Sequence, residues 1–598
     1  MSAPSTPSPP AASANKAWLR ALELTSGIER APRRLLYDVV EEQAAARPED
    51  AALVSDDTSL NYGALAARMH RYARWALAQG MAKGETVALM AGNTPDYMAA
   101  WLGLTGVGIV VALINANLRG EALAHSLAAA APRAVIASGE LAAVAEAAIS
   151  RSADAAALWV LGESEGRGLD QALASLPAGP LAAEERRGVS LRDTALLIYT
   201  SGTTGLPKAA RVSHRRVMSW SLWFAGMLGA GPQDRLYDCL PMYHSVGGVV
   251  ATGALLVSGG SVVIAPRFSA SRFWEDVVRW ECTQFQYIGE LCRYLVKAAP
   301  SPYERQHRLR MVCGNGLRED VWTPFQARFQ IPRILEFYAA TEGNFSLFNA
   351  EGRPGAIGRV PGFMAHRFPV AIVAFDPDIG APVRGADGRC VRCTPGEPGE
   401  AIGQISAADG SAAQRFEGYT DPEATEKKVL RDVFAPGDAW LRTGDLMRRD
   451  EKGFFYFVDR VGDTFRWKGE NVAASEVSAA IEACPGVEAS VVYGVTVPGA
   501  DGRAGMAAIV AGEDFDLTRL RRRLVEALPD YARPRFLRLS AALAVTDTFK
   551  QKLGQLVAQG FDPEQIDDAL YFDSPETGAF EPLDKALHAR IAAGDVRL

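Results

Sequence analysis

The sequence is poor in cysteine and has no surplus of positive charge, and each shortage excludes a class of protein. Seven cysteines are spread over 598 residues, an odd number that does not suit the disulfide framework of a secreted protein. A reducing cytoplasm is therefore the expected compartment. A net charge of −7 gives no long-range attraction for nucleic acid, so no nucleic-acid partner is expected. A local basic patch is not excluded, and peripheral contact with the inner face of a membrane stays open.

The chain also lacks a convincing secretion signal or membrane span. The first residues, "MSAPSTPSPPAASANK" (1–16), have no apolar core and predict a disordered tail. The uncharged segment 98–118, "MAAWLGLTGVGIVVALINANL", is about long enough to cross a bilayer. Its glycines and asparagines argue against a span. We expect a helix through "DYMAAWLGLTGVG" followed by the buried strand "IVVALI", and no transmembrane segment.

One cysteine pair has the short spacing found in zinc sites. Cys390 and Cys393 form "CVRC", but no second pair at zinc spacing accompanies them. We therefore predict that these two cysteines are structural or incidental.

The length and the alternation of patterns predict an α/β fold with several domains. A single core stops growing at about 250–300 residues, and this chain is longer and 48% hydrophobic. Between residues 32 and 264, helical stretches alternate with short apolar runs, which indicates layered sheets with largely parallel strands. These runs are "ETVALMAG", "RAVIASG", "TALLIYT" and "GGSVVIA". Turn-rich sequence between residues 370 and 403 predicts a small β-rich insert.

The pattern changes again after Asp459. "SEVSAAIEACPGV" predicts a helix capped by Ser475, and "ASVVYGVTV" and "MAAIVAG" predict strands. "DLTRLRRRLVEALP" predicts a second helix with its leucines turned inward. We expect a tail over residues 1–16, a large layered domain over 17–460 and a small α+β domain over 461–598.

The most informative segment is "IYTSGTTGLPKAA", residues 198–210. Backbone N–H groups of a glycine-rich loop after a strand form an anion site, and hydroxyls and a lysine add donors for phosphate oxygens. The loop is not the common P-loop, because Pro207 precedes Lys208 where that motif needs glycine. A mobile surface loop is the alternative. The predicted phosphate-binding residues are Tyr199, Thr200, Ser201, Gly202, Thr203, Thr204, Gly205 and Lys208.

This loop resembles the phosphate loop of the adenylate-forming enzymes, the superfamily of acyl-CoA synthetases, adenylation domains and luciferases. Further motifs follow in the order typical of that family: "LPMYHSVGG" (240–248), "YAATEGN" (338–344), "LRTGDL" (441–446) and "DRVGDTFRWKGENVAASEV" (459–477). "YIGELCRYL", "DTFRWKGENV" and "DTFKQKL" are similar to the fatty acid transport protein and very-long-chain acyl-CoA synthetase branch. The resemblance extends from about Arg34 to the C-terminus.

The resemblance assigns the nucleotide contacts. It implies that Tyr338 stacks on adenine, with the backbone of Gly314, Asn315 and Gly316 against the base. Thr341 and Glu342 offer hard oxygen ligands, and the resemblance implies that they hold Mg²⁺. Asp445 and Arg460 are expected at the ribose hydroxyls, although a Gly-Asp pair is also an ordinary turn.

The same resemblance implies a hinge and a passage for CoA. Gly462 matches the hinge of a mobile C-terminal domain, and Gly469 matches the place where the pantetheine arm passes. Arg466 and Lys468 are either solvated charges or contacts to nucleotide or CoA. His244 is expected beside the acyl-binding pocket, with a hydrogen-bonded core histidine as the alternative.

A lysine of the small domain completes the expected catalytic set of Lys550, Thr341, Glu342 and His244. Lys550 in "DTFKQKL" matches the lysine that reaches the active site in the family, and Lys552 is its near competitor. Asp547 stands where the branch commonly has glycine, which leaves the geometry of this loop open.

The sequence therefore predicts an ATP-dependent ligase that joins a long-chain or very-long-chain fatty acid to CoA, with ATP, CoA and Mg²⁺ as cofactors. We expect an apolar tunnel near "YIGELCRYL", where Gly289 leaves room beside Ile288. The alternatives are a CoA ligase or adenylating enzyme for another carboxylate, of carnitine, bile-acid or carrier-protein type, and an uptake protein that acts by vectorial acylation. No motif specifies the chain length of the acid or the oligomeric state.

Overall fold

A computed structural model describes residues 13–151, 156–162, 167–201, 207–376, 379–405, 416–461, 464–467, 470–498, 500, 502–543 and 553–596. The chain forms two compact units. The first consists of Met1–Arg367 with Ser406–Lys428, and the second of Phe368–Ile405 with Val429–Leu598. The boundary expected after residue 460 falls inside the second unit and stays a prediction.

The first unit contains an eight-stranded sheet. Its strands are β1 (Ala51–Val54), β2 (Ser59–Asn61), β9 (Arg235–Asp238), β10 (Ser261–Ile264), β11 (Gln284–Ile288), β12 (Met311–Asn315), β13 (Ile334–Ala339) and β14 (Ser346–Asn349). They lie in the order β14-β13-β12-β11-β9-β10-β1-β2, and the edge pairs β13–β14 and β1–β2 are antiparallel while the inner pairs are parallel. The segments that follow β9, β11 and β12 therefore leave from the same edge of the sheet.

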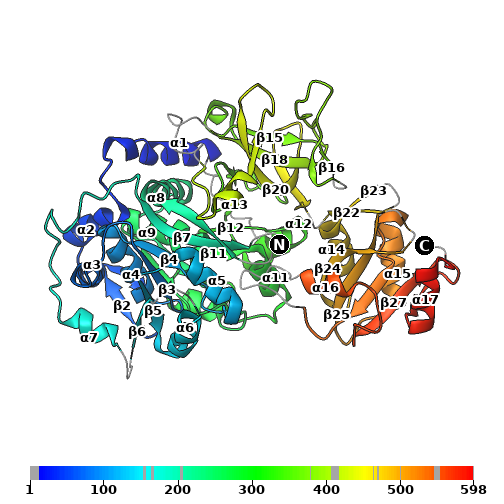
Figure 1. The fold of residues 1–598 in the computed structure, drawn as a ribbon, viewed down its shortest axis with the longest axis horizontal. Coiled ribbons are helices and arrows are strands. Elements are labelled where there is room, and N and C mark those ends of the chain that lie inside the picture. The colour runs from blue at the N-terminus through cyan, green and yellow to red at the C-terminus, as the bar shows by residue number, and fades with distance from the viewer. Residues whose placement is uncertain are drawn as a thin grey trace, which may run out of the picture. The chain divides into compact units, whose positions relative to one another are not determined.

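The first unit also contains a six-stranded sheet. It consists of β3 (Thr86–Met90), β4 (Val110–Leu113), β5 (Ala134–Ser138), β6 (Ala157–Leu161), β7 (Thr194–Ser201) and β8 (Pro207–Ser213). The order is β6-β5-β3-β4-β7-β8, parallel except for the hairpin β7–β8. The four apolar runs identified in the sequence form β3, β5, β7 and β10, so the predicted layered α/β class is confirmed (Figure 1).

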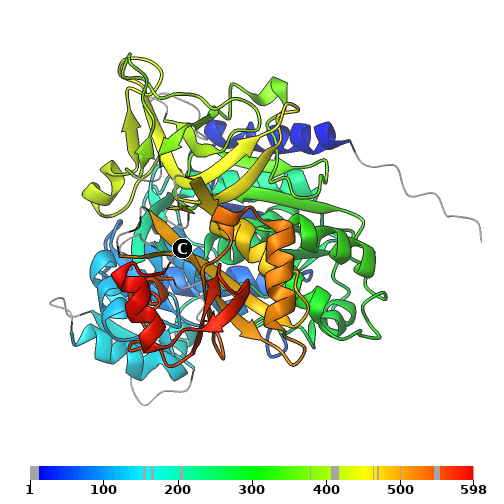
Figure 2. The same cartoon turned by 90° about the vertical axis from the view of Figure 1, so that its right-hand side faces the viewer.

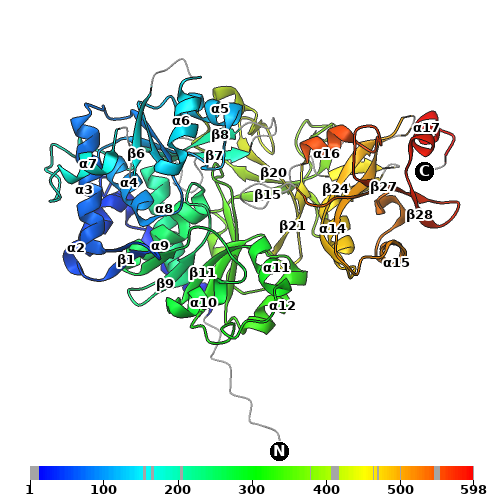
Figure 3. The same ribbon diagram turned by 90° about the horizontal axis from the view of Figure 1, so that it is seen from below.

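Thirteen α-helices accompany these sheets in the part of the first unit that the structure describes. They are α1 (Ala14–Thr25), α2 (Leu36–Ala46), α3 (Tyr62–Ala78), α4 (Pro95–Gly106), α5 (Gly120–Ala130), α6 (Ala142–Ile149), α7 (Leu169–Ala174), α8 (His214–Leu228), α9 (Ala251–Ser258), α10 (Phe273–Arg279), α11 (Gly289–Lys297), α12 (Glu319–Phe329) and α13 (Pro422–Glu426). Short helical turns are η1 (Ile28–Arg30), η2 (Gly139–Leu141), η4 (Gly362–Met364) and the π-helical η3 (Val246–Val250). Helices α2, α3 and α4 pack against one another (Figure 3).

The long uncharged segment does not cross a membrane as one helix. Thr94 caps α4 by accepting the N–H of Tyr97 at 3.2 Å, and Pro95 occupies the first turn. The helix ends at Gly106, and Gly108 at φ +80° turns the chain into the fully buried strand β4. The predicted helix followed by a strand is confirmed. Within the described ranges, no helix combines the length and apolarity that a bilayer span needs.

The second unit begins with the predicted β-rich insert. Its sheet consists of β15 (Val370–Val373), β18 (Gly399–Gln404), β19 (Val429–Arg431), β20 (Ala439–Arg449) and β21 (Phe455–Arg460). All of its pairs are antiparallel, in the order β15-β18-β20-β19 with β21 also paired to β20. A two-stranded ribbon joins β16 (Phe375–Asp376) to β17 (Ala381–Pro382).

The C-terminal part of this unit is the expected α+β structure. Its strands are β22 (Thr464–Trp467), β23 (Glu470–Ala473), β24 (Val487–Thr496), β25 (Arg503–Ala511), β26 (Phe536–Leu539), β27 (Ala569–Ser574) and β28 (Ala579–Pro582). Its helices are α14 (Ala474–Glu482), α15 (Leu517–Ala527), α16 (Gly554–Gln559), α17 (Lys585–Ala593) and the turn η6 (Asp530–Ala532). Helices α14 and α15 pack side by side (Figure 2), and Leu520 and Leu524 of α15 are buried as predicted.

The start of α14 differs from the prediction. The capping position is Ala473, which provides no side-chain cap, and Ser475 already lies inside the helix. The Ser475 hydroxyl donates to Val458 O at 2.6 Å, and its N–H donates to Asp459 Oδ2 at 3.3 Å. Asp459 therefore satisfies the first turn in place of a local serine cap.

The structural or incidental role expected for the pair in "CVRC" stays a prediction. Cys390 and Cys393 are free thiols, and burial raises the pKa of both, for Cys393 to about 11. Among the described residues no group of three or more His, Cys, Asp or Glu side chains is arranged to hold a metal ion.

Candidate active site

The predicted phosphate loop joins the hairpin β7–β8. Thr200 lies opposite Lys208 and Tyr199 opposite Ala209 in the antiparallel register, so the structure brings both ends of the motif together. Tyr199 is buried, and its hydroxyl donates to Ser126 O at 2.7 Å, which fastens β7 to α5. The Lys208 side chain is half-buried and makes no hydrogen bond or ion pair with the part of the chain that the structure describes.

A distant segment extends this hairpin. Arg211 N donates to Gly418 O at 3.0 Å, and Thr420 N donates to Ala209 O at 2.9 Å. Tyr419 thereby lies beside Ala210 as an added strand residue. In the same segment, the Glu417 carboxylate accepts the N–H and the hydroxyl of Ser213 at 2.8 and 2.7 Å.

The predicted residues Thr341 and Glu342 follow β13 and meet this added segment. Thr341 Oγ1 lies 3.0 Å from Ser245 Oγ, and its carbonyl accepts from Arg216 Nη1 at 2.7 Å. Glu342 Oε1 accepts the Tyr419 hydroxyl at 2.8 Å and lies 3.7 Å from Lys428 Nζ. These contacts bring Ser245, Thr341 and Glu342 together with the segment beside the phosphate-loop hairpin.

The expected base-binding backbone is held by a buried carboxylate that sequence reasoning missed. Glu336 accepts the N–H of Gly316 at 2.5 Å, the N–H of Leu317 at 3.1 Å and the hydroxyl of Tyr287 at 2.6 Å. Burial raises the pKa of Glu336 to about 8. Because Gly316 has φ +81°, this turn favours glycine, and Glu336 fixes its amide.

Two predicted base contacts flank this turn. Asn315 Oδ1 is buried and has no hydrogen-bond partner among the described groups. The Tyr338 ring is half-buried, and its centroid lies 5.7 Å from that of Phe345. An unpaired buried acceptor suits a ligand that carries an amino group, and an aromatic ring suits a flat one.

His244 lies in a turn that is held by hydrogen bonds from Asn93, a residue outside the motif. The His244 ring is half-buried, and its centroid is 4.6 Å from the ring of Tyr243. Asn93 fixes the turn by donating to Leu240 O at 2.8 Å and accepting from Met242 N at 2.9 Å. A β-carbon on Gly248 would lie 1.9 Å from Met242 O, so glycine is required there.

The expectation that Gly289 leaves room for an acyl chain is wrong. A β-carbon at this position would lie 1.8 Å from Gly316 O and 2.7 Å from Leu317 N. The space is filled by the backbone of the turn that Glu336 holds. Gly289 therefore permits α11 to approach that turn and does not line an open tunnel at this atom.

We expect Gly289→Ala to lower the free energy of unfolding by about 1–3 kcal/mol, because the added carbon forces two backbones apart. The turn at Gly316 should shift, so activity should fall alike for short and long acids. Thermal melting and activity on acids of several lengths test this. Gly27→Ala is the control, since a β-carbon there meets nothing within 4 Å. Selective loss of the longest acids would restore the tunnel interpretation.

In the second unit, the structure brings Asp445 and Arg460 together as predicted. They are paired residues of β20 and β21, and Arg460 Nε lies 3.6 Å from Asp445 Oδ1. Asp445 is largely buried at 13% side-chain exposure, whereas Arg460 is 44% exposed. The carboxylate is therefore shielded from water, whereas its counter-charge is exposed.

Another buried carboxylate shapes the turn in front of Asp445. Glu400 is fully buried, pairs with Arg442 at 2.8 Å and accepts Gly444 N at 3.2 Å. Gly444 has φ +76°, and Asp445 N donates to Thr443 Oγ1 at 3.0 Å. The role of Glu400 could not be predicted from a motif, because its partner Arg442 is distant in sequence.

Several predicted residues lie outside the described residues. These are Gly202, Thr203, Thr204 and Gly205 of the loop, the hinge Gly462, Lys468, Gly469, Lys550 and Lys552. Their assigned roles stay predictions.

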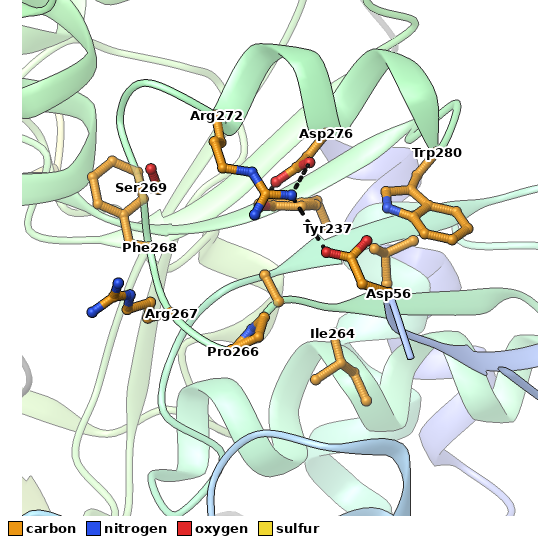
Figure 4. A pocket seen from close by; sticks show the side chains of 12 residues that line it. Asp56, Tyr237, Ile264, Pro266, Arg267, Phe268, Ser269, Arg272, Asp276 and Trp280 are labelled. Carbon is orange, nitrogen blue, oxygen red and sulfur yellow. Dashed lines mark hydrogen bonds and ion pairs between the residues drawn. The ribbon is translucent and has the colours of Figure 1, made fainter. Parts of the chain in front are cut away.

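A cavity of about 420 Å³ lies elsewhere in the first unit, after β9 and β10 (Figure 4). Its wall includes Tyr237, Phe268 and Trp280. Arg272 lies 3.3 Å from Asp276 and 3.4 Å from Asp56 across it. None of the predicted site residues lines this cavity.

Comparison with known proteins places the geometry in a family. Residues 40–402 match the family described as AMP-binding enzyme, and residues 476–550 match its C-terminal domain. The chain is 42% identical over 571 residues to long-chain fatty acid transport protein 1 of Mus musculus, covering 93% of this chain and 87% of that protein. It is 41% identical over 537 residues to the medium/long-chain-fatty-acid–CoA ligase FadD6 of Mycobacterium tuberculosis, covering 89% and 87%.

Solved structures agree on the fold. ATP-bound MatB from Rhodopseudomonas palustris matches with a TM-score of 0.73 at 23% identity, covering 87% of this chain and 98% of that one. A fatty acyl CoA synthetase of Mycobacterium tuberculosis matches with a TM-score of 0.62 at 24% identity, covering 88% and 98%. Together with the family match, these results confirm the predicted superfamily, and this chain belongs to the AMP-binding enzymes.

Proposed function

We propose that this AMP-binding enzyme is an ATP-dependent ligase that joins a long-chain or very-long-chain fatty acid to CoA. The two relatives at 41–42% identity support the substrate class, since one is named a long-chain fatty acid transport protein and the other a fatty-acid–CoA ligase. The observation that carries the proposal is the cluster in which Tyr419, added to the phosphate-loop hairpin, holds Glu342 beside it.

The chemistry explains why ATP is needed. A carboxylate is a poor electrophile, so the acid first displaces pyrophosphate from ATP and becomes an acyl-adenylate. The thiol of CoA then attacks the acyl carbon, the thioester forms and AMP leaves. Lys550 would neutralise the carboxylate and α-phosphate in the first step. Gly469 would line the pantetheine passage in the second, and His244 would lie beside the acyl chain.

The nucleotide contacts are part of the same proposal. The loop of residues 199–208 would cradle the phosphates, and the unpaired Oδ1 of Asn315 would accept from the adenine amino group beside Tyr338. Asp445 would accept the ribose hydroxyls, with Arg460 beside it.

Magnesium fits the donor set at Thr341 and Glu342. Mg²⁺ prefers hard oxygen ligands and is commonly bound by one or two carboxylates together with substrate phosphates. Thr341 Oγ1 and the Glu342 carboxylate are such donors, and Glu342 contacts Tyr419, which lies beside the phosphate-loop hairpin. When bound, the ion would offset phosphate charge.

The decisive experiment is a screen for CoA-dependent AMP release over carboxylic acids from acetate to very-long-chain and bile-type acids. We expect the highest kcat/KM with long or very long aliphatic acids. We expect no AMP release when CoA is left out. AMP release that peaks with a short, aromatic or steroidal acid would contradict the substrate class. The proposal places the enzyme in the cytoplasm or at the inner membrane face, where such acids partition.

A further inference from the structure

The described contacts of the Glu342 carboxylate are made by one of its two oxygens, Oε1. Oε1 accepts the Tyr419 hydroxyl at 2.8 Å and lies 3.7 Å from Lys428 Nζ. Oε2 has no hydrogen bond or ion pair to any residue that the structure describes. The side chain is largely buried, with 12% exposure, so its orientation is set by these contacts and not by bulk water.

Tyr419 is itself rigidly placed. Its backbone neighbours pair with β8 through Gly418 and Thr420, and its ring packs against Ala210 and Ala424. The phenol thus links the phosphate-loop hairpin to the Glu342 carboxylate.

We propose that Tyr419 is a positioning residue that fixes Glu342 Oε1 and presents Oε2 to the divalent cation of the nucleotide, while Lys428 acts as the counter-ion of this carboxylate before the cation arrives. The inference rests on the proposed function in taking Glu342 as the carboxylate that meets the cation. It adds two residues to which the sequence motifs assign no role.

The two side chains should have opposite effects. Tyr419→Phe removes only the hydroxyl, so the carboxylate becomes free to rotate and cation affinity should fall about tenfold, the size expected for one charge-assisted hydrogen bond. Lys428→Met removes a positive charge near the site, so the same affinity should rise several-fold. General loosening of the fold would lower affinity in both variants.

The test measures binding without turnover. Mn²⁺ is titrated by electron paramagnetic resonance into the full-length protein saturated with a non-hydrolysable ATP analogue. Tyr72→Phe is the matched control, because Tyr72 is a buried tyrosine whose hydroxyl donates to the Asp96 carboxylate at 2.5 Å, outside the site. Thermal melting should show a similar small loss of stability in Tyr419→Phe and Tyr72→Phe.

The expected pattern is weaker Mn²⁺ binding in Tyr419→Phe, unchanged binding in Tyr72→Phe and tighter binding in Lys428→Met. Binding in Tyr419→Phe within twofold of the control would overturn the role of Tyr419. Unchanged or weaker binding in Lys428→Met would overturn the role of Lys428. Because Lys428 is only partly buried, Lys428→Met can still be measured if Tyr419→Phe fails to fold. If the pattern holds while no fatty acid is activated, the proposed function fails alone. If fatty acids are activated and the pattern is absent, the inference fails alone.

Discussion

Replacing Lys550 with alanine is expected to slow adenylation about 10²–10³-fold while thiolysis of a supplied acyl-adenylate continues. The family resemblance places this lysine against the carboxylate and α-phosphate, and loss of one preorganised donor has an effect of this size. In the second half-reaction the adenylate is already formed, so that charge is no longer required. Pyrophosphate exchange measures the first step, and CoA consumption with synthetic acyl-AMP measures the second.

Gly469→Leu is the matched variant with the reverse expectation. Its side chain would fill the pantetheine passage without touching the nucleotide, so exchange should persist while acyl-CoA formation fails. Thermal melting controls for folding in both variants. Full-rate adenylation in Lys550→Ala would transfer the role to Lys552 or remove it from this loop. Equal loss of both steps in both variants would argue against two orientations of the small domain.

Asp445→Ala should weaken ATP binding by about 10²–10⁴-fold. A carboxylate accepts two ribose hydroxyls, and each charge-assisted bond contributes about 1.5–3 kcal/mol. The substitution also takes away the partner that lies 3.6 Å from Arg460. Calorimetric titration with ATP gives the affinity directly.

The nucleotide itself supplies the control for Asp445. The unmodified protein should bind 2′,3′-dideoxy-ATP far more weakly than ATP, whereas Asp445→Ala should bind the two alike. Asp445→Asn, which keeps one acceptor oxygen, should fall between them. Undiminished preference for ATP in Asp445→Ala would show that another group reads the ribose.

Local sequence patterns were enough to predict many of the strands in the fold. The apolar runs that became β3, β5 and β7 are buried on both faces, and such strands need no distant information to be recognised. The Asp445–Arg460 pair and the Thr341–Glu342 cluster were also foreseeable, because short motifs specify them residue by residue.

The supporting contacts were not predictable from the sequence. Glu336, Glu400 and Tyr419 act through partners far along the chain, and nothing in their local sequence identifies those partners. The serine assigned as a helix cap instead binds Val458, because a tertiary acceptor competed with the local one. Gly289 was misinterpreted for the same reason, since its neighbour is the turn at Gly316 and not empty space.

The strand added to the phosphate-loop hairpin also has a consequence for synthesis of the protein. Ser213 and Glu417, which join the hairpin to that segment, are 204 positions apart in the chain. At about 5–20 residues per second, a ribosome needs about 10–40 s to make the intervening polypeptide. During that interval β8 has an unpaired edge, of the kind that invites pairing with other chains. We therefore expect the nascent chain to be open to aggregation through this edge between the emergence of β8 and the arrival of Tyr419.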